Sequence, residues 1–230
     1  MACNLNIGKT LHAASNPFGS PPTFAASCWV YPLSQVQQAL TGIGEALGNW
    51  SWLALTSGGR ARAYRGTLAW AETANAYTSG AWNHVYAYFA GNTYREVALN
   101  GGAAAASSAT GISGTFVRTW IGDPNASWHL QGWVAEVAYW DQPLSGDERA
   151  ALARGISALV VRPRRLVRYW PLLNADVLRC LVSGEVLVPA GGPTAARHVP
   201  VVQAARPSLA LPTAAAGGWW WRQFVLGQAS

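Results

Sequence analysis

The acidic residues could hydrolyse a bond only if two of them faced each other, and their spacing gives little support for such a pair. Glycoside hydrolysis uses two carboxyl groups roughly 5–9.5 Å apart across the scissile bond. Among the 10 acidic residues, Asp147 and Glu148 are the only adjacent pair. Both fall in the first turn of a predicted helix, where carboxylates stabilise the helix dipole. We therefore expect the protein not to be an enzyme.

The histidines and cysteines do not have the spacing of a zinc or iron site. The chain contains four isolated histidines: His12, His84, His129 and His198. Zinc and iron sites repeat their ligands at short intervals such as C-x-x-C or H-x-x-x-H, and neither pattern occurs here. The odd number of cysteines, 3, does not indicate a disulfide framework. We expect no bound cofactor.

Calcium is a metal that the sequence leaves open. Loop oxygens bind this ion, and three residues could offer them: Asp123, Asn125 and Asp141. Scattered donors of this kind would make a weak site, and Asp123-Pro124-Asn125 is also typical of a turn. Calcium binding is therefore an alternative and not an expectation.

An aromatic stripe over residues 82–88 could bind a sugar. Side chains alternate between the two faces of a strand, so one face of this segment carries Trp82, His84, Tyr86 and Tyr88. Such a face could stack on sugar rings. A stripe like this is more often the packed side of a sandwich strand or a protein interface, and we favour that interpretation over a glycan platform.

The positive charge is carried almost entirely by arginine. The net charge is +6, and the 16 basic residues include a single lysine, Lys9. Four arginines cluster beside Tyr169 and Trp170: Arg162, Arg164, Arg165 and Arg168. Arginine next to aromatic residues can bind nucleic acid, but Pro163 and Pro171 are typical of an extended connector. We therefore favour docking of this cluster on an acidic neighbouring protein.

The C-terminal segment carries a second candidate interface. Behind Gly217-Gly218 the sequence gathers aromatic and basic side chains: Trp219, Trp220, Trp221, Arg222 and Phe224. Exposed on a monomer, such a patch would favour association, and aromatic and Arg side chains dominate protein contacts. The segment is predicted either to bind a sister subunit or a larger shell, or to form a terminal strand of the domain.

Short apolar segments separated by turn residues predict an antiparallel β protein. Five of them precede residue 123: 49–56, 60–65, 67–73, 83–90 and 116–122. No long helical pattern intervenes, which argues against a parallel α/β enzyme. The apolar spacing over 35–48 predicts a short helix or compact loop, and the Gly- and Ala-rich segment 101–114 predicts a mobile loop.

The clearest succession of elements runs from residue 120 to residue 171. Residues 133–140 form an apolar run whose only charge is Glu136, which predicts a strand covered on both faces. Ser145 and Glu148 then have the S-x-x-E spacing of a capping box, so a short helix is predicted that ends near Gly155.

This succession resembles the laminin-G-like, concanavalin A-like jelly rolls, in which a core strand G-x-I-x-E-V-x-x-W leads to L-S-x-x-E and a short helix. Three earlier segments resemble other strands of that fold: TFAASCWVYPL at 23–33, AWNHVYAYFAG at 81–91 and YREVALNGG at 94–102. VRPRRLVRYWPL at 161–172 and ARHVP at 196–200 resemble a version found in tailed-bacteriophage structural proteins. Glucanase relatives carry their acids on one strand as E-x-D-x-x-E, and this chain lacks such a strand.

The resemblance implies an all-β fold, an antiparallel β-sandwich of the concanavalin A-like jelly-roll type with one short helix and extended N- and C-terminal arms. We expect an N-terminal arm over residues 1–22 and the jelly roll over 23–172. A Pro-rich C-terminal extension with its Trp cluster is expected over 173–230.

The same resemblance implies a non-enzymatic virion structural protein, such as a capsid decoration or accessory surface protein, assembled in the host cytoplasm. The expected partners are other virion proteins, such as the major capsid protein, and further copies of the chain in a homo-oligomer. No membrane contact is expected, because no apolar run reaches the ~18 residues needed to cross a bilayer. The alternative is a lectin-like adhesin that binds a host glycan on the particle surface.

Overall fold

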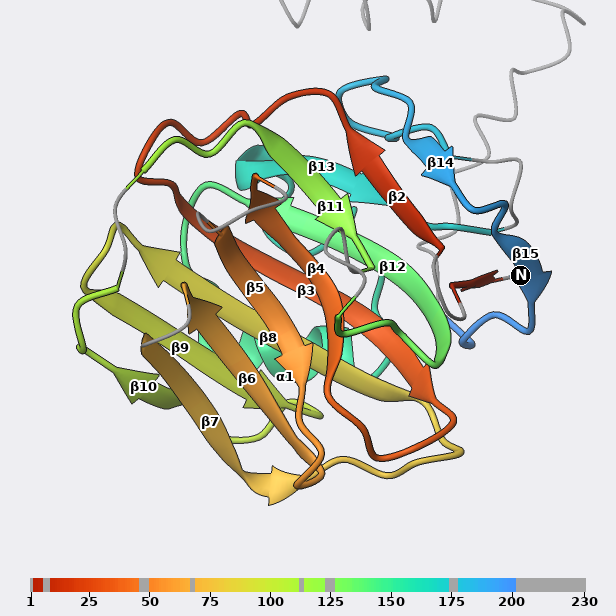
Figure 1. Cartoon of the computed structure of the whole chain (residues 1–230), viewed down its shortest axis with the longest axis horizontal. Coiled ribbons are helices and arrows are strands. Elements are labelled where there is room, and N and C mark those ends of the chain that lie inside the picture. The colour runs from red at the N-terminus through yellow and green to blue at the C-terminus, as the bar shows by residue number, and fades with distance from the viewer. Residues whose placement is uncertain are drawn as a thin grey trace, which may run out of the picture.

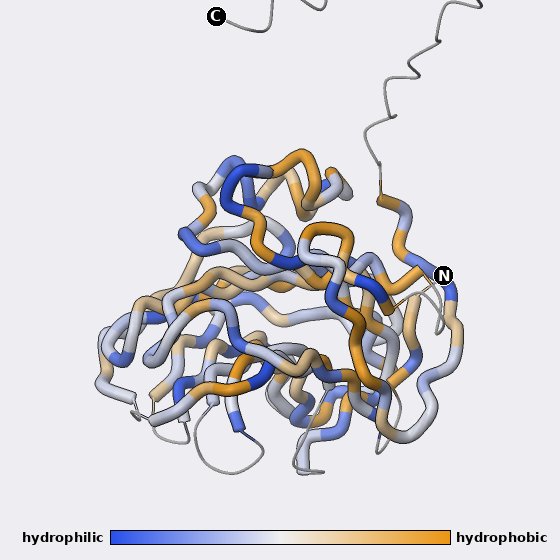
Figure 2. Tube along the Cα trace, turned by 90° about the horizontal axis from the view of Figure 1, so that it is seen from above, coloured by the Kyte–Doolittle hydropathy of each residue, from blue (hydrophilic) through white to orange (hydrophobic). Residues whose placement is uncertain are grey.

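The computed structural model describes residues 2–5, 9–45, 50–66, 69–111, 114–122, 127–173 and 178–201. Within these ranges the chain forms a sandwich of two antiparallel sheets, which confirms the predicted fold class. Figure 1 shows the sheets stacked face to face, with helix α1 (Gly146–Ala153) on the far side of the eight-stranded sheet. Figure 2 views the two layers from one edge.

The eight-stranded sheet has the order β10-β9-β8-β3-β12-β1-β15, and β13 also pairs with β12. Its strands are β1 (Ala2–Asn4), β3 (Thr23–Pro32), β8 (Asn83–Ala90), β9 (Tyr94–Leu99), β10 (Ala105–Ser107), β12 (Gly132–Trp140), β13 (Leu166–Trp170) and β15 (Thr194–Ala196). Strand β1 pairs with the first half of β12, and β13 pairs with the second half. Strand β12 therefore has three partner strands, β1, β3 and β13, and we call it the central strand for this reason.

The seven-stranded sheet has the order β14-β2-β11-β4-β5-β6-β7. Its strands are β2 (Thr10–Ala13), β4 (Gln38–Gly44), β5 (Trp50–Leu55), β6 (Arg60–Arg65), β7 (Ala69–Ala76), β11 (Arg118–Ile121) and β14 (Val188–Ala190). All described strand pairs in both sheets are antiparallel, as short turns between successive strands require.

Apolar side chains from the facing sides of the two sheets fill the space between them. Alternate residues of β5 and β6 meet alternate residues of β3, β8 and β9 in one buried cluster. Phe24 stacks on Phe89 with ring centroids 4.9 Å apart. Cys28 lies in this cluster as a free, buried thiol.

Strand β12 is buried along nearly its whole length and carries a bulge at Glu136. The φ angle of Glu136 is 54°, and the register with β3 shifts between Ala135 and Ala138. A bulge leaves one residue unpaired and turns its side chain in a new direction. The Glu136 carboxylate accepts a hydrogen bond from the Tyr169 hydroxyl and contacts His198 Nε2 at 3.2 Å. This contact fastens the segment that follows β15 to the central strand.

His198 is held by more than the carboxylate. Its ring nitrogens also lie 2.6 Å from the carbonyl of Val199 and 3.0 Å from that of Pro171. Burial alone would lower the pKa of His198, but these contacts and Glu136 outweigh burial and raise it. The charged imidazolium is therefore favoured at this site.

Helix α1 begins with the predicted capping box. The Glu148 backbone N–H donates to the Ser145 hydroxyl at 3.3 Å, and the Ser145 N–H donates to the Glu148 carboxylate at 2.7 Å. Two backbone N–H groups at the start of the helix, which have no carbonyl partner within it, are thereby hydrogen-bonded. No helix in the described part of the chain is long and apolar enough to cross a membrane.

Two predictions of local structure are wrong. The segment 35–48, predicted as a helix or compact loop, contains strand β4 instead. A bulge between Ala39 and Thr41 makes Leu40 an extra residue in the strand. The buried Leu40 and Ile43 therefore lie three residues apart, which mimics helical spacing. The segment 101–114, predicted as a mobile loop, contributes β10, which pairs with β9.

The expected arms also require correction. Of residues 1–22, β1 pairs with β12 and β15, and β2 pairs with β11 and β14. Of residues 173–230, β14 and β15 each extend one sheet, and residues 174–177 and 202–230 lie outside the described residues. Pro189 is tolerated because β14 is an edge strand. The described parts of both segments therefore belong to the sandwich.

Gly42 of β4 makes room for a tryptophan of the neighbouring strand. A Cβ atom at this position would lie 2.2 Å from the backbone oxygen of Ser51 and 3.1 Å from the Trp52 ring. No side chain can be added there without moving the backbone of β5. Gly146, at the start of α1, has only the flexible Arg149 side chain within 4 Å.

We expect Gly42→Ala to lower the free energy of unfolding by roughly 3 kcal/mol or more, because the added methyl group overlaps backbone atoms. Gly146→Ala is the matched control and should be neutral or slightly stabilising, because alanine favours a helix. Urea unfolding followed by tryptophan fluorescence measures both. Equal stability of the two variants would show that β4 and β5 do not pack as described.

Candidate functional site

An aromatic row crosses the outer face of the seven-stranded sheet. Strand register aligns Trp120 of β11 with Gly42 of β4, then with Trp52 of β5, Tyr64 of β6 and Trp70 of β7. Paired residues on adjacent strands point to the same face. We define the aromatic row as Trp120, Trp52, Tyr64 and Trp70.

Two further tryptophans pack against this row. Trp50 contacts Trp52 and Tyr64 edge-on, with centroid distances of 6.3 and 6.0 Å. Trp128 lies against Trp50 at 5.5 Å and against Tyr64 at 5.2 Å. Tilted and edge-on contacts at these distances are favourable between aromatic rings. The rings therefore hold one another in fixed orientations.

The row is buried at one end and open at the other. Trp120, Trp52 and Tyr64 are 8%, 3% and 4% exposed, whereas Trp70 is 43% exposed. Trp70 stands next to Tyr64, with ring centroids 6.2 Å apart. A large exposed aromatic ring on a rigid sheet is a surface on which a ligand can stack.

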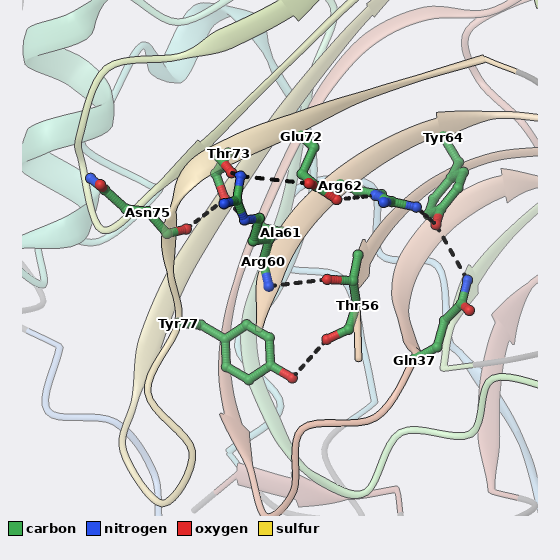
Figure 3. A network of polar contacts seen from close by, with 10 residues as sticks. All are labelled: Gln37, Thr56, Arg60, Ala61, Arg62, Tyr64, Glu72, Thr73, Asn75 and Tyr77. Carbon is green, nitrogen blue, oxygen red and sulfur yellow. Dashed lines mark hydrogen bonds and ion pairs between the residues drawn. The ribbon is translucent and has the colours of Figure 1, made fainter. Parts of the chain in front are cut away.

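Polar side chains lie beside Tyr64, the neighbour of Trp70 in the row, as Figure 3 shows. Arg62 donates one hydrogen bond to Glu72 from Nε and another to the Tyr64 hydroxyl from Nη1 at 2.8 Å. Gln37 Nε2 donates to the same hydroxyl at 3.3 Å. Arg62 and Glu72 are directly opposed on β6 and β7. We define the polar group as Gln37, Arg62 and Glu72.

Arg62 links the polar group to the rings. Its guanidinium carbon lies 5.1 Å from the centroid of Trp70 and 5.6 Å from that of Tyr64, within the range of cation–π attraction. Partial burial alone would lower the pKa of Arg62, but its hydrogen bonds with Tyr64 and Glu72 outweigh burial and raise it. Arg62 therefore keeps its charge while lying between two rings.

The turn below the polar group is fixed by main-chain contacts. The Arg60 N–H donates to the Thr56 hydroxyl and the Ala61 N–H donates to the Thr73 hydroxyl, each at 3.1 Å. The Tyr77 hydroxyl donates to the Thr56 carbonyl, also at 3.1 Å (Figure 3). These bonds lie where the register of β6 with β7 shifts, between Arg60 and Arg62. Beyond this irregularity, Arg62 and Glu72 are directly opposed.

The glycan platform predicted on β8 is covered. His84 and Tyr86 are 1% and 0% exposed. Tyr86 packs with Leu152 of α1, and its hydroxyl accepts a hydrogen bond from the Leu144 N–H at 3.0 Å. The stripe does share one face of a strand, as predicted, but α1 and its preceding loop cover part of that face. His84 and Tyr86 are therefore packing residues.

The other two residues of that stripe are half-buried and lie apart from each other. Tyr88 contacts Tyr94, with centroids 6.2 Å apart. Trp82 joins a separate group at the opposite end of β8, where Tyr31 stacks on Trp133 at 4.4 Å and meets Trp82 edge-on at 5.7 Å. We call Tyr31, Trp82 and Trp133 the Tyr31 cluster.

The predicted arginine cluster does not form one strip. Arg168 is 3% exposed and binds Ser15, Thr119 and Glu185 inside the fold, so it is no longer a candidate for docking. Arg162 is half-buried and pairs with Glu148 at 2.8 Å.

Two arginines of that cluster remain on the surface. Arg165 pairs with Asp141 at 3.4 Å, and Arg164 is exposed. The C-terminal candidates Trp219, Trp220, Trp221, Arg222 and Phe224 lie outside the described residues.

One of the three possible calcium ligands, Asp141, is paired with an arginine. Asp141 is exposed and engaged by Arg165, and Asp123 and Asn125 lie outside the described residues. Among the residues that the structure describes, no group of three or more His, Cys, Asp or Glu side chains could hold a metal ion.

Sequence reasoning missed the aromatic row, although a signal was present. The segment 49–56 contains Trp50 and Trp52 two residues apart, and Tyr64 and Trp70 follow in the next two predicted strands. Alternation places Trp50 and Trp52 on one face. Their alignment with Tyr64, Trp70 and Trp120 depends on strand register, which the sequence does not state.

The fold and a sequence profile identify the class of protein. Residues 8–148 match the profile of the concanavalin A-like lectin/glucanases superfamily, and the chain belongs to this family. A comparison with curated proteins finds no match.

Solved structures share the fold at low sequence identity. A putative carbohydrate-binding protein from Bacteroides ovatus is 14% identical with a TM-score of 0.59, covering 86% of this chain and 62% of its own. A heptameric SAP-like pentraxin from Limulus polyphemus is 11% identical with a TM-score of 0.51, covering 83% and 90%. The enzymatically active domain of bacteriophage CBA120 tailspike protein 2 has a TM-score of 0.48 at 17% identity, covering 71% and 28%, and is too distant to bear on function.

The burial of His84 predicts a pH dependence of stability. Burial lowers the pKa of His84 to about 3 from 6.5, so the folded chain excludes a proton that the unfolded chain binds. This contribution is complete above pH 6.5 and is lost as the pH falls toward 3. Through His84, the free energy of unfolding should therefore be about 2 kcal/mol lower at about pH 5 than at about pH 7.

Comparison with His84→Leu isolates this effect. The variant lacks the titrating group, so its free energy of unfolding should fall less between about pH 7 and about pH 5 than that of the wild type. His198 has the opposite sign of shift but is present in both proteins and cancels in the difference. Urea unfolding at the two pH values measures the effect, and identical pH slopes would contradict the burial of His84.

Proposed function

We propose that the domain is a non-enzymatic carbohydrate-binding module and that it binds sugar on the open end of the aromatic row. The observation that carries this proposal is the combination of the exposed Trp70 ring with the polar group beside it. Sugars bind proteins through stacking of their apolar faces on aromatic rings and through directed hydrogen bonds to their hydroxyls. The ring and the polar side chains that could make these two kinds of contact lie side by side here.

The polar group suits hydroxyl ligands. Glu72 presents carboxylate oxygens as acceptors, and Arg62 and Gln37 present N–H donors. Hydrogen bonds to charged groups are stronger than neutral ones, and the Arg62–Glu72 pair supplies both signs within one contact. Gln37 and Arg62 are already oriented by Tyr64, and Glu72 by Arg62, so binding would require little further ordering of the protein.

The carboxylate of this face supports binding without turnover. Among the described residues, Glu72 is the carboxylate of the polar group, and it is engaged by both Arg60 and Arg62. Hydrolysis of a glycoside needs two carboxyl groups across the bond. Membership of the concanavalin A-like lectin/glucanases superfamily is compatible with either role, because the superfamily includes both lectins and glucanases.

The Tyr31 cluster is a weaker candidate for the same role. Its rings are half-buried, and the nearby Val199 and Val201 pack with the same group. The rings of Tyr31, Trp82 and Trp133 contact one another. Specific sugar recognition needs convergent polar groups, and the aromatic row has them.

Trp70→Ala should lower the affinity for the best oligosaccharide ligand of the wild type by about 10-fold or more, because it removes one stacked ring. Trp82→Ala is the matched control on the other sheet and should bind as the wild type does. A glycan array identifies the ligand, and titration calorimetry measures the affinity of each variant.

Two outcomes would contradict this proposal. Absence of sugar binding by the wild type, with and without calcium, would remove the carbohydrate-binding role. Loss of binding in Trp82→Ala with retention in Trp70→Ala would move the site to the Tyr31 cluster.

We further propose that this module is displayed on a virion of a tailed bacteriophage as a decoration or accessory surface protein. The sequence resemblance at 161–172 and 196–200 supports this location. In the structure these segments contribute Tyr169 and His198. Both side chains contact the Glu136 carboxylate and so hold the two segments against strand β12. The proposed partners are other virion proteins and further copies of this chain.

Density-gradient sedimentation tests the virion proposal. The full chain should sediment with intact particles, and deletion of residues 217–230 should release it while the thermal unfolding of the sandwich stays unchanged. A full chain that remains at the top of the gradient would contradict the virion location. Retention of the truncated chain on particles would show that the C-terminal Trp cluster is not the contact.

A further inference from the structure

Two arginines point into the space between the sheets. Arg65 follows Ala61 and Ala63 on the inner face of β6, and Arg95 precedes Val97 on the inner face of β9. Arg65 is 1% exposed and Arg95 is 0% exposed. Strands β6 and β9 belong to opposite sheets, so the two positive charges approach each other across the interior.

Neutral groups surround both guanidinium groups. Arg65 donates to the Ser51 hydroxyl and, at 2.7 Å, to Asn92 Oδ1. Arg95 donates from Nη2 to the carbonyl of Ala109 and, at 3.5 Å, to that of Asn92. None of the ion pairs found in the described part of the chain includes Arg65 or Arg95.

Three donor nitrogens of this pair have no hydrogen-bond partner among the described residues. They are Nε of Arg65 and both Nε and Nη1 of Arg95, and all three are buried. Burial and the neighbouring charge of Arg95 lower the pKa of Arg65 to about 10, which still leaves it protonated at neutral pH. A buried charge without a counter-ion is strongly unfavourable.

We propose that Arg65 and Arg95 together bind one small oxyanion, of the class of phosphate, sulfate or a carboxylate group. An oxyanion supplies the missing negative charge, and its several acceptor oxygens match the unpartnered donors. This anion site is separate from the aromatic row, because the row lies on the outer face of the sheet that contains β6 and the two arginines lie between the sheets. It does not depend on the proposed carbohydrate binding.

The segment after β10 closes the site close beneath the surface. Ala109, whose carbonyl accepts from Arg95, is itself exposed. The Gly111 N–H donates to the Asn92 carbonyl at 2.8 Å, and a Cβ on Gly111 would lie 2.2 Å from Cγ of Arg65. This segment therefore packs directly on the arginine pair, and an anion would reach the pair from this end of the sandwich.

Equilibrium dialysis of the full chain with labelled inorganic phosphate tests the proposal directly. In a chloride buffer of constant ionic strength, we expect one phosphate to bind per chain, with competition by sulfate. A separate arm with acetate distinguishes a carboxylate site from a site for tetrahedral anions. The preferred anion should also raise Tm by about 5 °C at saturation.

Arg95→Met and Arg65→Met should each abolish binding and the anion-dependent shift in Tm. Arg164→Met is the matched control, because it removes one exposed positive charge and should bind as the wild type does. Equal binding by Arg95→Met and the wild type would identify an adventitious ion only and overturn the proposal. If the interior variants fail to fold, the wild type still decides, because binding of none of the three anions would overturn the proposal.

Discussion

Both sheets of this sandwich carry apolar side chains on their outer as well as their inner faces, and the need to cover those outer faces shapes the rest of the structure. Only 11% of the residues are charged, and aromatic residues make up another 11%. On the eight-stranded sheet, α1 and the segment around Val199 provide cover. On the seven-stranded sheet, tryptophan and tyrosine rings cover one another. The face that relies on its own rings is the face left open to a ligand at Trp70.

Local signals in the sequence were enough to predict the class of fold. The run at 133–140, the Ser145–Glu148 capping box and the turn-separated apolar segments all act between near neighbours, and each appears where expected. The same reasoning failed over 35–48, because the bulge in β4 alters the apolar spacing. It also missed β1, β2, β14 and β15, since short strands with distant partners have little local pattern.

The candidate site was harder to predict for two reasons. Which side chains are covered, and which strands pair in which register, both depend on residues far apart in the sequence. Alternation correctly groups His84 with Tyr86, yet the helix that covers Tyr86 begins 60 residues later. From the sequence, Arg168 is predicted to belong to a basic surface cluster. In the structure it is buried, because its partners Ser15, Thr119 and Glu185 come from three distant segments. Conversely, Trp120, Tyr64 and Trp70 form one row only through the register of five adjacent strands.

The pairing of β1 with β12 and β15, and of β2 with β11 and β14, also has a kinetic consequence. Strands β1 and β2 are synthesised before all of these partners, which lie more than a hundred residues downstream. Folds dominated by such distant pairings form slowly and expose unpaired strand edges meanwhile. During synthesis the nascent chain therefore presents β1 and β2 without their partner strands, and a chaperone that shields them would raise the yield of native protein.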